Sequence, residues 1–356
     1  MKAITNMKES YANFQAMDSK DKNNFIKETL LNNLLYILIL IAIIFTAIKN
    51  PKFMSVSAVA TIVTLSAASI PIALGIAGCI VLTGTDLSAG RVVGLTACIT
   101  AALLQASDYP NKMFPDIPAL PIPVVILIVM AVGAIIGLVN GFFVAKYNLH
   151  PFIVTLATQL ITYGILLVFL MTNGNNGQPL SGLDKGFVGF VTGSKISLFG
   201  VAIPNYVWYA IIYVIVMWFI WNKTTFGKNM FAVGSNPEAA NVSGVSVFKT
   251  TIMVHTLAGA MYGITGFIDS ARNSSNTAGT GLNAECDAIA ACVIGGVSFV
   301  GGTGKISGIV LGVFILRIIF VALTYLSVDQ NLQYIFKGGI ILVACAIDMR
   351  KYLVRK

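Results

Sequence analysis

Long runs of uncharged, apolar residues recur about ten times in this sequence, and they constrain its fold more than any other feature. Only 10% of the 356 residues are charged and 56% are hydrophobic, whereas about 25% of the residues of a soluble domain are charged. An α-helix needs roughly 20 apolar residues to cross about 30 Å of hydrocarbon. The chain is therefore predicted to be an all-α, polytopic transmembrane helical bundle of about ten spans, with membrane lipid as its solvent.

Hydropathy divides the chain into a polar N-terminal tail at 1–32, a transmembrane domain at 33–348 and a short C-terminal tail at 349–356. An even number of spans places both tails on the same side of the membrane. The predicted spans are 33–48, 57–83, 92–106, 121–146, 151–171, 204–221, 249–268, 286–300, 306–326 and 332–348.

The distribution of Lys and Arg predicts on which side of the membrane the two tails lie. If the N-terminus is inside, the inner segments contain fifteen Lys and Arg residues and the outer segments contain six. Since basic residues favour the cytoplasmic side, both termini are predicted to be cytoplasmic. The net charge of +9 is scattered and forms no stripe, which argues against a nucleic-acid partner. Five scattered cysteines and two histidines predict neither a metal site nor a cofactor.

Two spans have lengths that do not suit a simple helix. The span at 57–83 is too long for one straight helix, the span at 286–300 is too short, and glycine-rich sequence follows both. We predict broken or re-entrant helices near 75–91 and 286–305, because irregular backbone is tolerated at membrane depth only where protein or water surrounds it. The two glycine-rich stretches also resemble each other at an offset of 218 residues, either by chance or because they are an internal repeat.

Ionisable and polar side chains within the apolar sequence are the candidates for a substrate pathway, because such groups are costly in a membrane. Asp86 and Ser88 lie in the stretch GTDLSAGR, where they either begin and cap the next helix or line the pathway. Asn140 and Gln159 lie inside spans and hydrogen-bond either a substrate or a neighbouring helix. Glu285 and Asp287 face an outer vestibule or simply favour a helix start. The sequence identifies no partner for Arg317.

The longest inner loop, at 222–248, predicts a short surface helix. Asn236 suits the N-cap, Pro237 the first helical position, Glu238 the positive end of the helix dipole, and Gly244 a left-handed terminus. Such a helix either docks a soluble partner or belongs to an ordinary structured loop. The stretch Gly301–Lys305 lacks the residues of a nucleotide-binding loop, so the chain is predicted to be a non-catalytic subunit that does not hydrolyse ATP itself.

Several segments together resemble the membrane subunit of ribose- and galactose-type ABC sugar importers over nearly the whole chain after the N-terminal tail. They are GTDLSAGR, VNGFFVAK at 139–146, PFIVTLAT at 151–158, the loop FGKNMFAVGSNPEAANVSGV, and DAIAACVIGGVSFVGGTG. The resemblance implies a permease in a bacterial cytoplasmic (inner) membrane that carries a monosaccharide into the cytoplasm. Galactose or methyl galactoside is the first candidate for this cargo.

The same resemblance implies three protein partners: a second permease copy in a homodimer, a cytoplasmic ABC ATPase and an extracytoplasmic sugar-binding protein. The segment 172–203 would dock the binding protein, and no role is implied for Arg317 or for 107–120. The candidate pathway residues are Asp86, Ser88, Asn140, Thr155, Gln159, Glu285 and Asp287. The candidate ATPase-coupling residues are Asn236, Pro237, Glu238, Ala239, Ala240 and Gly244.

An ion-coupled secondary sugar transporter is the alternative, because broken helices and repeats occur in that class too. The two functions differ in their energy source. A secondary transporter would work without ATP and would not need the loop at 234–245.

Overall fold

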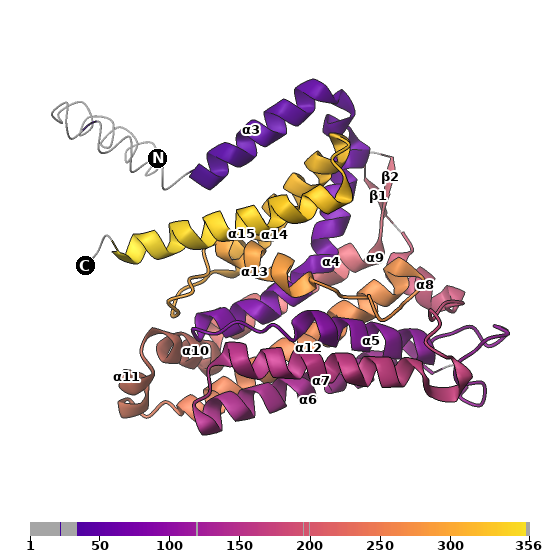
Figure 1. Cartoon of the computed structure of the whole chain (residues 1–356), viewed down its shortest axis with the longest axis horizontal. Helices are drawn as coiled ribbons and strands as arrows, with labels where there is room; N and C mark the ends of the chain where they lie inside the picture. Colours follow the sequence, from indigo (N-terminus) through magenta and orange to yellow (C-terminus); the bar gives the residue numbers. More distant parts are fainter. Residues whose placement is uncertain (1–21, 23–33, 119, 195, 199, 354–356) are drawn as a thin grey trace.

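The computed structural model describes residues 22, 34–118, 120–194, 196–198 and 200–353. The predicted N-terminal tail, apart from Lys22, and residues 354–356 of the predicted C-terminal tail lie outside this range. The elements, of which the α-helices and strands are labelled in Figure 1, are α3 (Leu34–Lys49), η1 (Pro51–Met54), α4 (Val56–Val81), α5 (Ala89–Leu103), α6 (Ile122–Tyr147), α7 (Pro151–Leu170), η2 (Thr172–Gly174), α8 (Lys185–Thr192), β1 (Ile196–Leu198), β2 (Val201–Ile203), α9 (Asn205–Lys223), α10 (Thr225–Ser235), α11 (Pro237–Val242), α12 (Val247–Asn273), α13 (Ala284–Ile294), α14 (Ile306–Tyr325) and α15 (Gln330–Leu353).

The predicted all-α membrane fold is confirmed. Each of the ten predicted spans corresponds to one helix, namely α3, α4, α5, α6, α7, α9, α12, α13, α14 and α15. Within the described residues, six helices are long and apolar enough to cross a membrane by themselves. The remaining regular structure is short, and the described strands form one antiparallel hairpin in which Ile196 pairs with Ile203.

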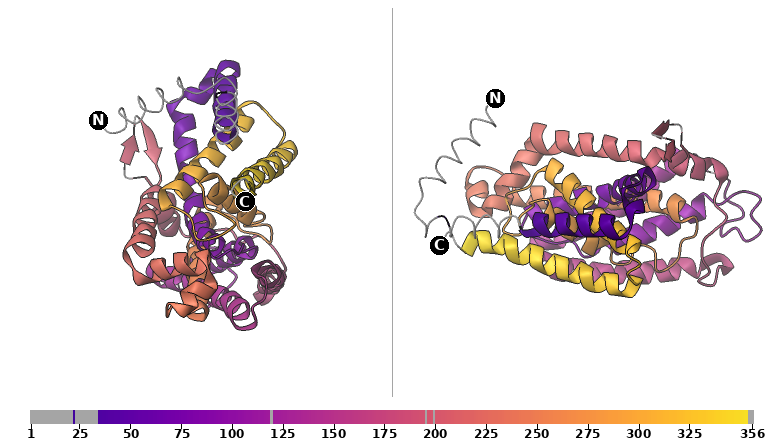
Figure 2. Two further views of the ribbon diagram at one scale, coloured as in Figure 1. Left: turned by 90° about the vertical axis from the view of Figure 1, so that its left-hand side faces the viewer. Right: turned by 90° about the horizontal axis from the view of Figure 1, so that it is seen from above.

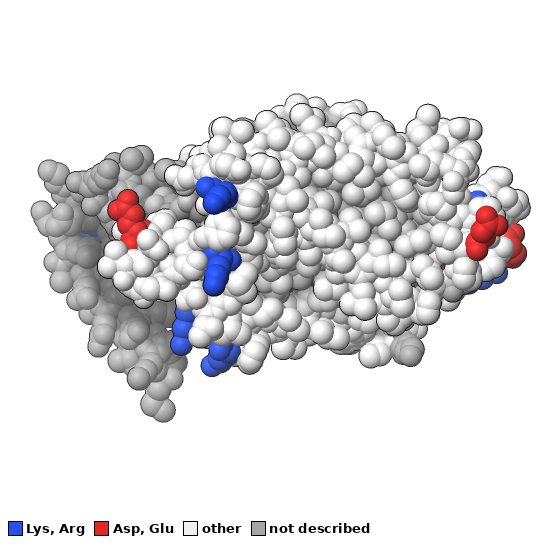
Figure 3. All heavy atoms as spheres, turned by 90° about the horizontal axis from the view of Figure 1, so that it is seen from below, with Lys and Arg blue, Asp and Glu red and all other residues white. Residues whose placement is uncertain are grey.

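On the face shown in Figure 3, two polar ends of the bundle are separated by an uncharged belt. In Figure 1 the helices α10 and α11 lie at the left-hand end, and α8 lies toward the right-hand end. We call these the α11 end and the α8 end. Figure 3 shows Lys and Arg side chains gathered near the α11 end, a second group of charges at the α8 end, and a wide surface between them that carries no charge. This belt is the surface expected of a protein that crosses lipid.

The centre of the bundle contains the most buried helices. α12 and α4 have most of their apolar windows buried, and α5 is buried along nearly its whole length. Figure 2 shows α9 and α15 on opposite sides of this centre, while α6 and α7 cover it from below in Figure 1. The outer helices instead expose large apolar side chains, such as Leu160 of α7 and Ile212 of α9.

Glycine residues bring α6 and α12 unusually close together. A Cβ atom added at Gly133 or Gly137 of α6 would lie 2.1 or 2.0 Å from a backbone oxygen of α12. Gly259 and Gly263 of α12 face α6 in the same way. Because lipid tails are as apolar as the helices, this close packing of small residues is a main source of helix association in membranes.

The structure corrects the predicted breaks in two details. The long span is a single helix, α4, which continues through Pro71. The break comes after it, in the seven residues from Leu82 to Ser88. The short span is shorter than predicted, because α13 ends at Ile294 and Gly296 then adopts a left-handed conformation with φ of 82°. Non-helical backbone therefore flanks α13 on both sides.

Candidate functional site

A buried hydrogen-bond network surrounds Asp86 in the loop between α4 and α5. Asp86 Oδ1 accepts hydrogen bonds from the Ser88 amide at 2.9 Å and from Ser88 Oγ at 2.6 Å. The hydroxyl of Tyr262, on α12, donates to Asp86 Oδ2 at 3.2 Å. Asp86 and Ser88 are fully buried. A carboxylate at this depth is tolerated because several donors satisfy it.

Asn140 and Thr155 extend the network to two further helices. Asn140 of α6 donates from Nδ2 to Ser88 Oγ at 3.0 Å. Thr155 of α7 accepts from the Leu87 amide at 3.1 Å and donates to the Thr85 carbonyl at 3.3 Å. Thus four of the candidate pathway residues, Asp86, Ser88, Asn140 and Thr155, lie together and hold the broken segment against α6, α7 and α12.

The helix-cap interpretation of Asp86 is wrong in its detail. α5 begins only at Ala89, and its N-cap residue Ser88 makes no side-chain capping bond. Asp86 instead closes a turn with Ser88, three residues before the helix begins at Ala89. Sequence reasoning did not single out Tyr262, because nothing in its local context distinguishes it from the other aromatic residues of the spans.

The other candidate pathway residues lie outside this network. Gln159 is half buried one turn further along α7. Glu285 is buried in the first turn of α13, and its Oε2 atom occupies the space that a Cβ atom at Gly90 would need. Nearby, Arg91 donates to the Ala278 carbonyl at 3.1 Å and its guanidinium lies 4.1 Å from the centre of the Tyr163 ring.

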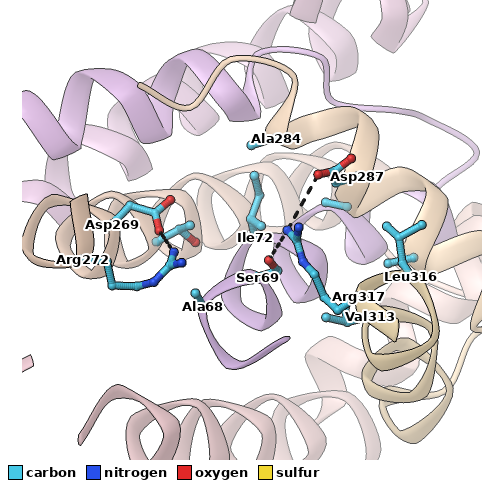
Figure 4. A pocket seen from close by; sticks show the side chains of 13 residues that line it. Ala68, Ser69, Ile72, Asp269, Arg272, Ala284, Asp287, Val313, Leu316 and Arg317 are labelled. Carbon is cyan, nitrogen blue, oxygen red and sulfur yellow. Dashed lines mark hydrogen bonds and ion pairs between the residues drawn. The ribbon is translucent and has the colours of Figure 1, made fainter. Parts of the chain in front are cut away.

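Asp287 is the centre of a second polar cluster. Its Oδ1 lies 2.6 Å from Nζ of Lys337 on α15, and its Oδ2 lies 3.7 Å from Nη2 of Arg317 on α14. The same Arg317 nitrogen donates to Ser69 Oγ on α4 at 2.5 Å. Asp287 is thus the partner that the sequence did not identify for Arg317 (Figure 4). Through Arg317 and Lys337 it connects α13 to α14 and α15.

A small pocket adjoins this cluster between α4, α12, α13 and α14 (Figure 4). Asp269 and Arg272 of α12 form a second ion pair in its wall, at 2.6 Å. The pocket volume is about 80 Å³, well below the roughly 300–1,000 Å³ of ordinary ligand pockets. In this conformation the pocket suits a few water molecules and is too small for a sugar.

The predicted surface helix is present at the α11 end. α11 spans Pro237–Val242, and Asn236 caps it by accepting the Ala239 amide at 2.9 Å. Glu238 lies in its first turn, and Gly244 adopts φ of 82° where the chain leaves it. Ala240 is buried against the rest of the protein, whereas Val242 is 90% exposed.

Comparison with known proteins identifies the family of this chain. The family model described as the branched-chain amino acid transport system / permease component matches residues 54–345. The chain belongs to this permease family. It is therefore a multi-pass membrane protein, and the matched range includes both broken segments, α11 and the Asp287 cluster.

Several curated members of this permease family are similar to the chain over nearly its whole length. The galactose/methyl galactoside import permease protein MglC of Salmonella typhimurium is 46% identical over 322 residues, which are 90% of this chain and 95% of that protein. MglC of Escherichia coli K12 is 45% identical over 341 residues, 96% of this chain and 99% of that protein. The ribose import permease protein RbsC of E. coli K12 is 33% identical over 326 residues, 90% of this chain and 93% of that protein. The resemblance seen in the sequence is confirmed. No solved structure matches the chain.

Proposed function

We propose that this chain is the membrane-spanning permease subunit of an ABC importer that carries a monosaccharide, galactose or methyl galactoside, into the cytoplasm. The observation that carries the proposal is the identity of 45–46% to two galactose/methyl galactoside import permeases across nearly the full length of all three chains. Ribose import permeases are less similar, at 33%. The difference in identity favours galactose over ribose as the cargo.

The energy comes from a separate cytoplasmic ABC ATPase, which docks at the α11 end. Two features support this assignment. α11 is a capped helix that exposes Val242 to solvent, and the adjoining ends of α6, α9 and α12 and the helix α10 carry Lys146, Lys223, Lys249 and Lys228, all exposed. A concentration of basic residues at one end is also typical of the cytoplasmic side of an inner-membrane protein. The chain ends are then cytoplasmic as well.

The extracytoplasmic sugar-binding protein docks at the α8 end. There the loops at 105–113 and 173–181 enclose an open polar recess of about 520 Å³. Gln105 holds the two loops together by donating to the Ser181 carbonyl at 2.8 Å and accepting from the Met113 amide at 2.8 Å. A recess with a fixed backbone loses little conformational entropy when a partner binds.

Transport itself follows from alternation between two conformations, driven by ATP binding in the ATPase and transmitted through α11. The permease performs no covalent chemistry. A second copy of the chain completes the transporter as a homodimer, and a path that must release its cargo binds the sugar only weakly.

One observation favours the ion-coupled alternative. Three ion pairs, Asp269 with Arg272, Asp287 with Arg317 and Asp287 with Lys337, lie within the bundle, and intramembrane charges of this kind often belong to proton or ion relays. In an ABC permease the two pairs of Asp287 connect helices, and the pair of Asp269 with Arg272 stabilises α12 itself.

Reconstitution separates the two functions. The chain, its ATPase and its binding protein are placed in proteoliposomes, and uptake of labelled galactose, ribose and xylose is measured with and without ATP. We expect galactose uptake that requires ATP and disappears when an ATPase variant that binds but does not hydrolyse ATP is used. Uptake that persists without ATP and follows an ion gradient would overturn the proposal in favour of the secondary transporter.

A further inference from the structure

The charged side chains around the pocket between α4, α12, α13 and α14 do not balance. Asp269 and Arg272 neutralise each other at 2.6 Å. Asp287 has two cationic neighbours, because Lys337 Nζ lies 2.6 Å from its Oδ1 and Arg317 Nη2 lies 3.7 Å from its Oδ2. Among the described residues, the cluster therefore combines three cations with two carboxylates. One positive charge is in excess, inside a bundle where an uncompensated charge is costly.

The excess charge is fixed by the kinds of side chain that carry it. Arginine does not lose its proton in proteins. Lys337 is surrounded by groups that attract a cation, since its Nζ also lies 5.3 Å from the centres of the Phe320 and Tyr334 rings. Neither cationic neighbour of Asp287 is therefore placed to become neutral.

Arg317 is the cation that lacks a full counter-charge. Lys337 approaches Asp287 more closely, and 3.7 Å is longer than a hydrogen bond. Arg317 Nη2 donates instead to the uncharged hydroxyl of Ser69. Its Nε is buried, and no atom of the described residues accepts a hydrogen bond from it. Leaving such a donor unpaired in a protein interior is unfavourable, so Arg317 needs an acceptor that carries a negative charge.

Two other buried carboxylates, Glu285 and Asp86, are not placed to supply that charge. Glu285 directs its Oε2 into the space beside Gly90 of α5, and Asp86 accepts from the hydroxyl of Tyr262 on α12. Neither carboxylate lines the pocket. The counter-charge of Arg317 therefore comes from outside the chain.

The pocket provides space for a small anion beside Arg317. Its volume is about 80 Å³, and Arg272 and Arg317 both line it. Figure 4 shows the pair of Asp269 with Arg272 and the pair of Asp287 with Arg317 on opposite sides of it. A volume of this size admits a monatomic ion with a few water molecules. The charged side chains in its wall keep 15–23% of their surface exposed, so the pocket is not sealed against an ion.

We propose that this pocket binds one chloride ion, which accepts hydrogen bonds from Arg317 and neutralises the excess charge of the cluster. A monatomic anion suits the site because guanidinium groups form strong, charge-assisted hydrogen bonds to anions and because its size is close to that of a water molecule. Between Arg317 and Arg272, the ion connects α14 to α12. The inference goes beyond the proposed function and does not depend on it.

Chloride binding is measured on the purified full-length permease in detergent, without ATPase or sugar. Radioactive chloride should bind at one site per chain and should be displaced by bromide but not by gluconate. Replacing gluconate by chloride at constant ionic strength should raise the unfolding temperature by about 2–5 °C once the chloride concentration is about ten times its Kd. Absence of halide-specific binding to the wild-type chain would overturn the inference and leave the proposed transport function untouched.

The variant Lys337→Met tests the charge balance itself. Lys337 does not line the pocket, but its removal leaves Asp287 free to neutralise Arg317, so the excess charge disappears. We expect chloride to bind at least about ten-fold more weakly to this variant and to leave its unfolding temperature unchanged. Lys52→Met, at an exposed lysine of η1, is the matched control and should bind chloride as the wild type does.

The variant Arg317→Met removes the excess charge and the unpaired donor together. It leaves Asp287 paired with Lys337 and Asp269 paired with Arg272, so it should fold and should bind no chloride. Chloride binding that is unchanged in Lys337→Met or in Arg317→Met would overturn the inference, because the anion would then occupy another site or act as a general salt. The wild-type measurement decides the question even where a variant does not fold.

Discussion

At the scale of single residues, the buried polar groups act mainly as ties between helices. Asp86 receives two bonds from Ser88 and one from Tyr262, and Asn140 and Thr155 attach the same loop to α6 and α7. In the described conformation these side chains bond to one another, apart from the buried Oδ1 of Asn140, which has no partner. The bonds favour a bracing role over direct sugar contact. A substitution can distinguish the two roles.

Asp86→Ala should destabilise the protein by about 3–5 kcal/mol, because it leaves three buried donors without an acceptor. The measurement is thermal unfolding of the purified protein in detergent, followed by uptake per folded molecule. Asp108→Ala, at an exposed loop position, is the control and should change stability by less than about 0.5 kcal/mol. A variant that keeps its stability but loses uptake would show that Asp86 contacts the sugar.

The Asp287 cluster predicts that replacing Asp287 destabilises the protein more than replacing Lys337 does. Asp287→Asn removes the counter-charge of both Arg317 and Lys337 and should cost about 3–5 kcal/mol. Lys337→Met leaves Asp287 with Arg317 and should cost no more than about 1–2 kcal/mol. The double variant should lose less stability than the sum of the losses in the two single variants. Strict additivity in unfolding measurements would mean that the ion pair contributes nothing to stability.

The sequence identified Asp287 and Arg317 as costly charges but could not pair them. The two residues lie on different helices, and Lys337 comes from a third, so the pairing depends on how α13, α14 and α15 pack. By contrast, local signals sufficed for Asn236 and Gly244, because a cap and a left-handed terminus are determined within a few residues.

At the scale of elements, hydropathy located every span but not the ends of the broken helices. It extended the span containing α13 to 300, because Val297, Phe299 and Val300 are apolar, whereas the helix ends at Ile294. Hydropathy averages over side chains and does not register the positive φ of Gly296. The resemblance between the two glycine-rich stretches stays a prediction, although they touch where the Gly302 amide donates to the Val81 carbonyl at 2.9 Å.

The close packing of α6 on α12 predicts a contrast between two glycines. Gly137→Leu should prevent stable folding, because even its Cβ atom would lie 2.0 Å from the His255 carbonyl oxygen. Gly164→Leu on α7 meets no atom within 4 Å and should be neutral or slightly stabilising, since glycine costs about 1 kcal/mol in a helix. The yield of monodisperse protein in size-exclusion chromatography reports whether each of the two variants folds. Equal yields would contradict the described α6–α12 contact.

At the scale of the whole molecule, the chain is a membrane body whose two ends have different chemistry. The α11 end offers a short helix with lysines around it, and the α8 end offers a polar recess. In the proposed transporter energy enters at the first end and the sugar at the second. This division predicts that a change at α11 affects coupling to ATP without affecting the stability of the bundle.

The substitution Val242→Asp tests whether α11 serves coupling to ATP and not the stability of the bundle. The side chain is 90% exposed, so the substitution should change the stability of the isolated permease by less than about 0.5 kcal/mol. In the assembled transporter Val242 would be buried against the ATPase, and an unpaired carboxylate there should weaken binding by at least about 2–3 kcal/mol, or roughly 30- to 150-fold. Val242→Ile keeps the apolar contact and should bind normally. Two measurements check this: retention of the ATPase on immobilised permease, and ATP-dependent uptake. Both should fall in Val242→Asp and neither in Val242→Ile. A normal ATPase affinity in Val242→Asp would show that α11 is not part of the interface.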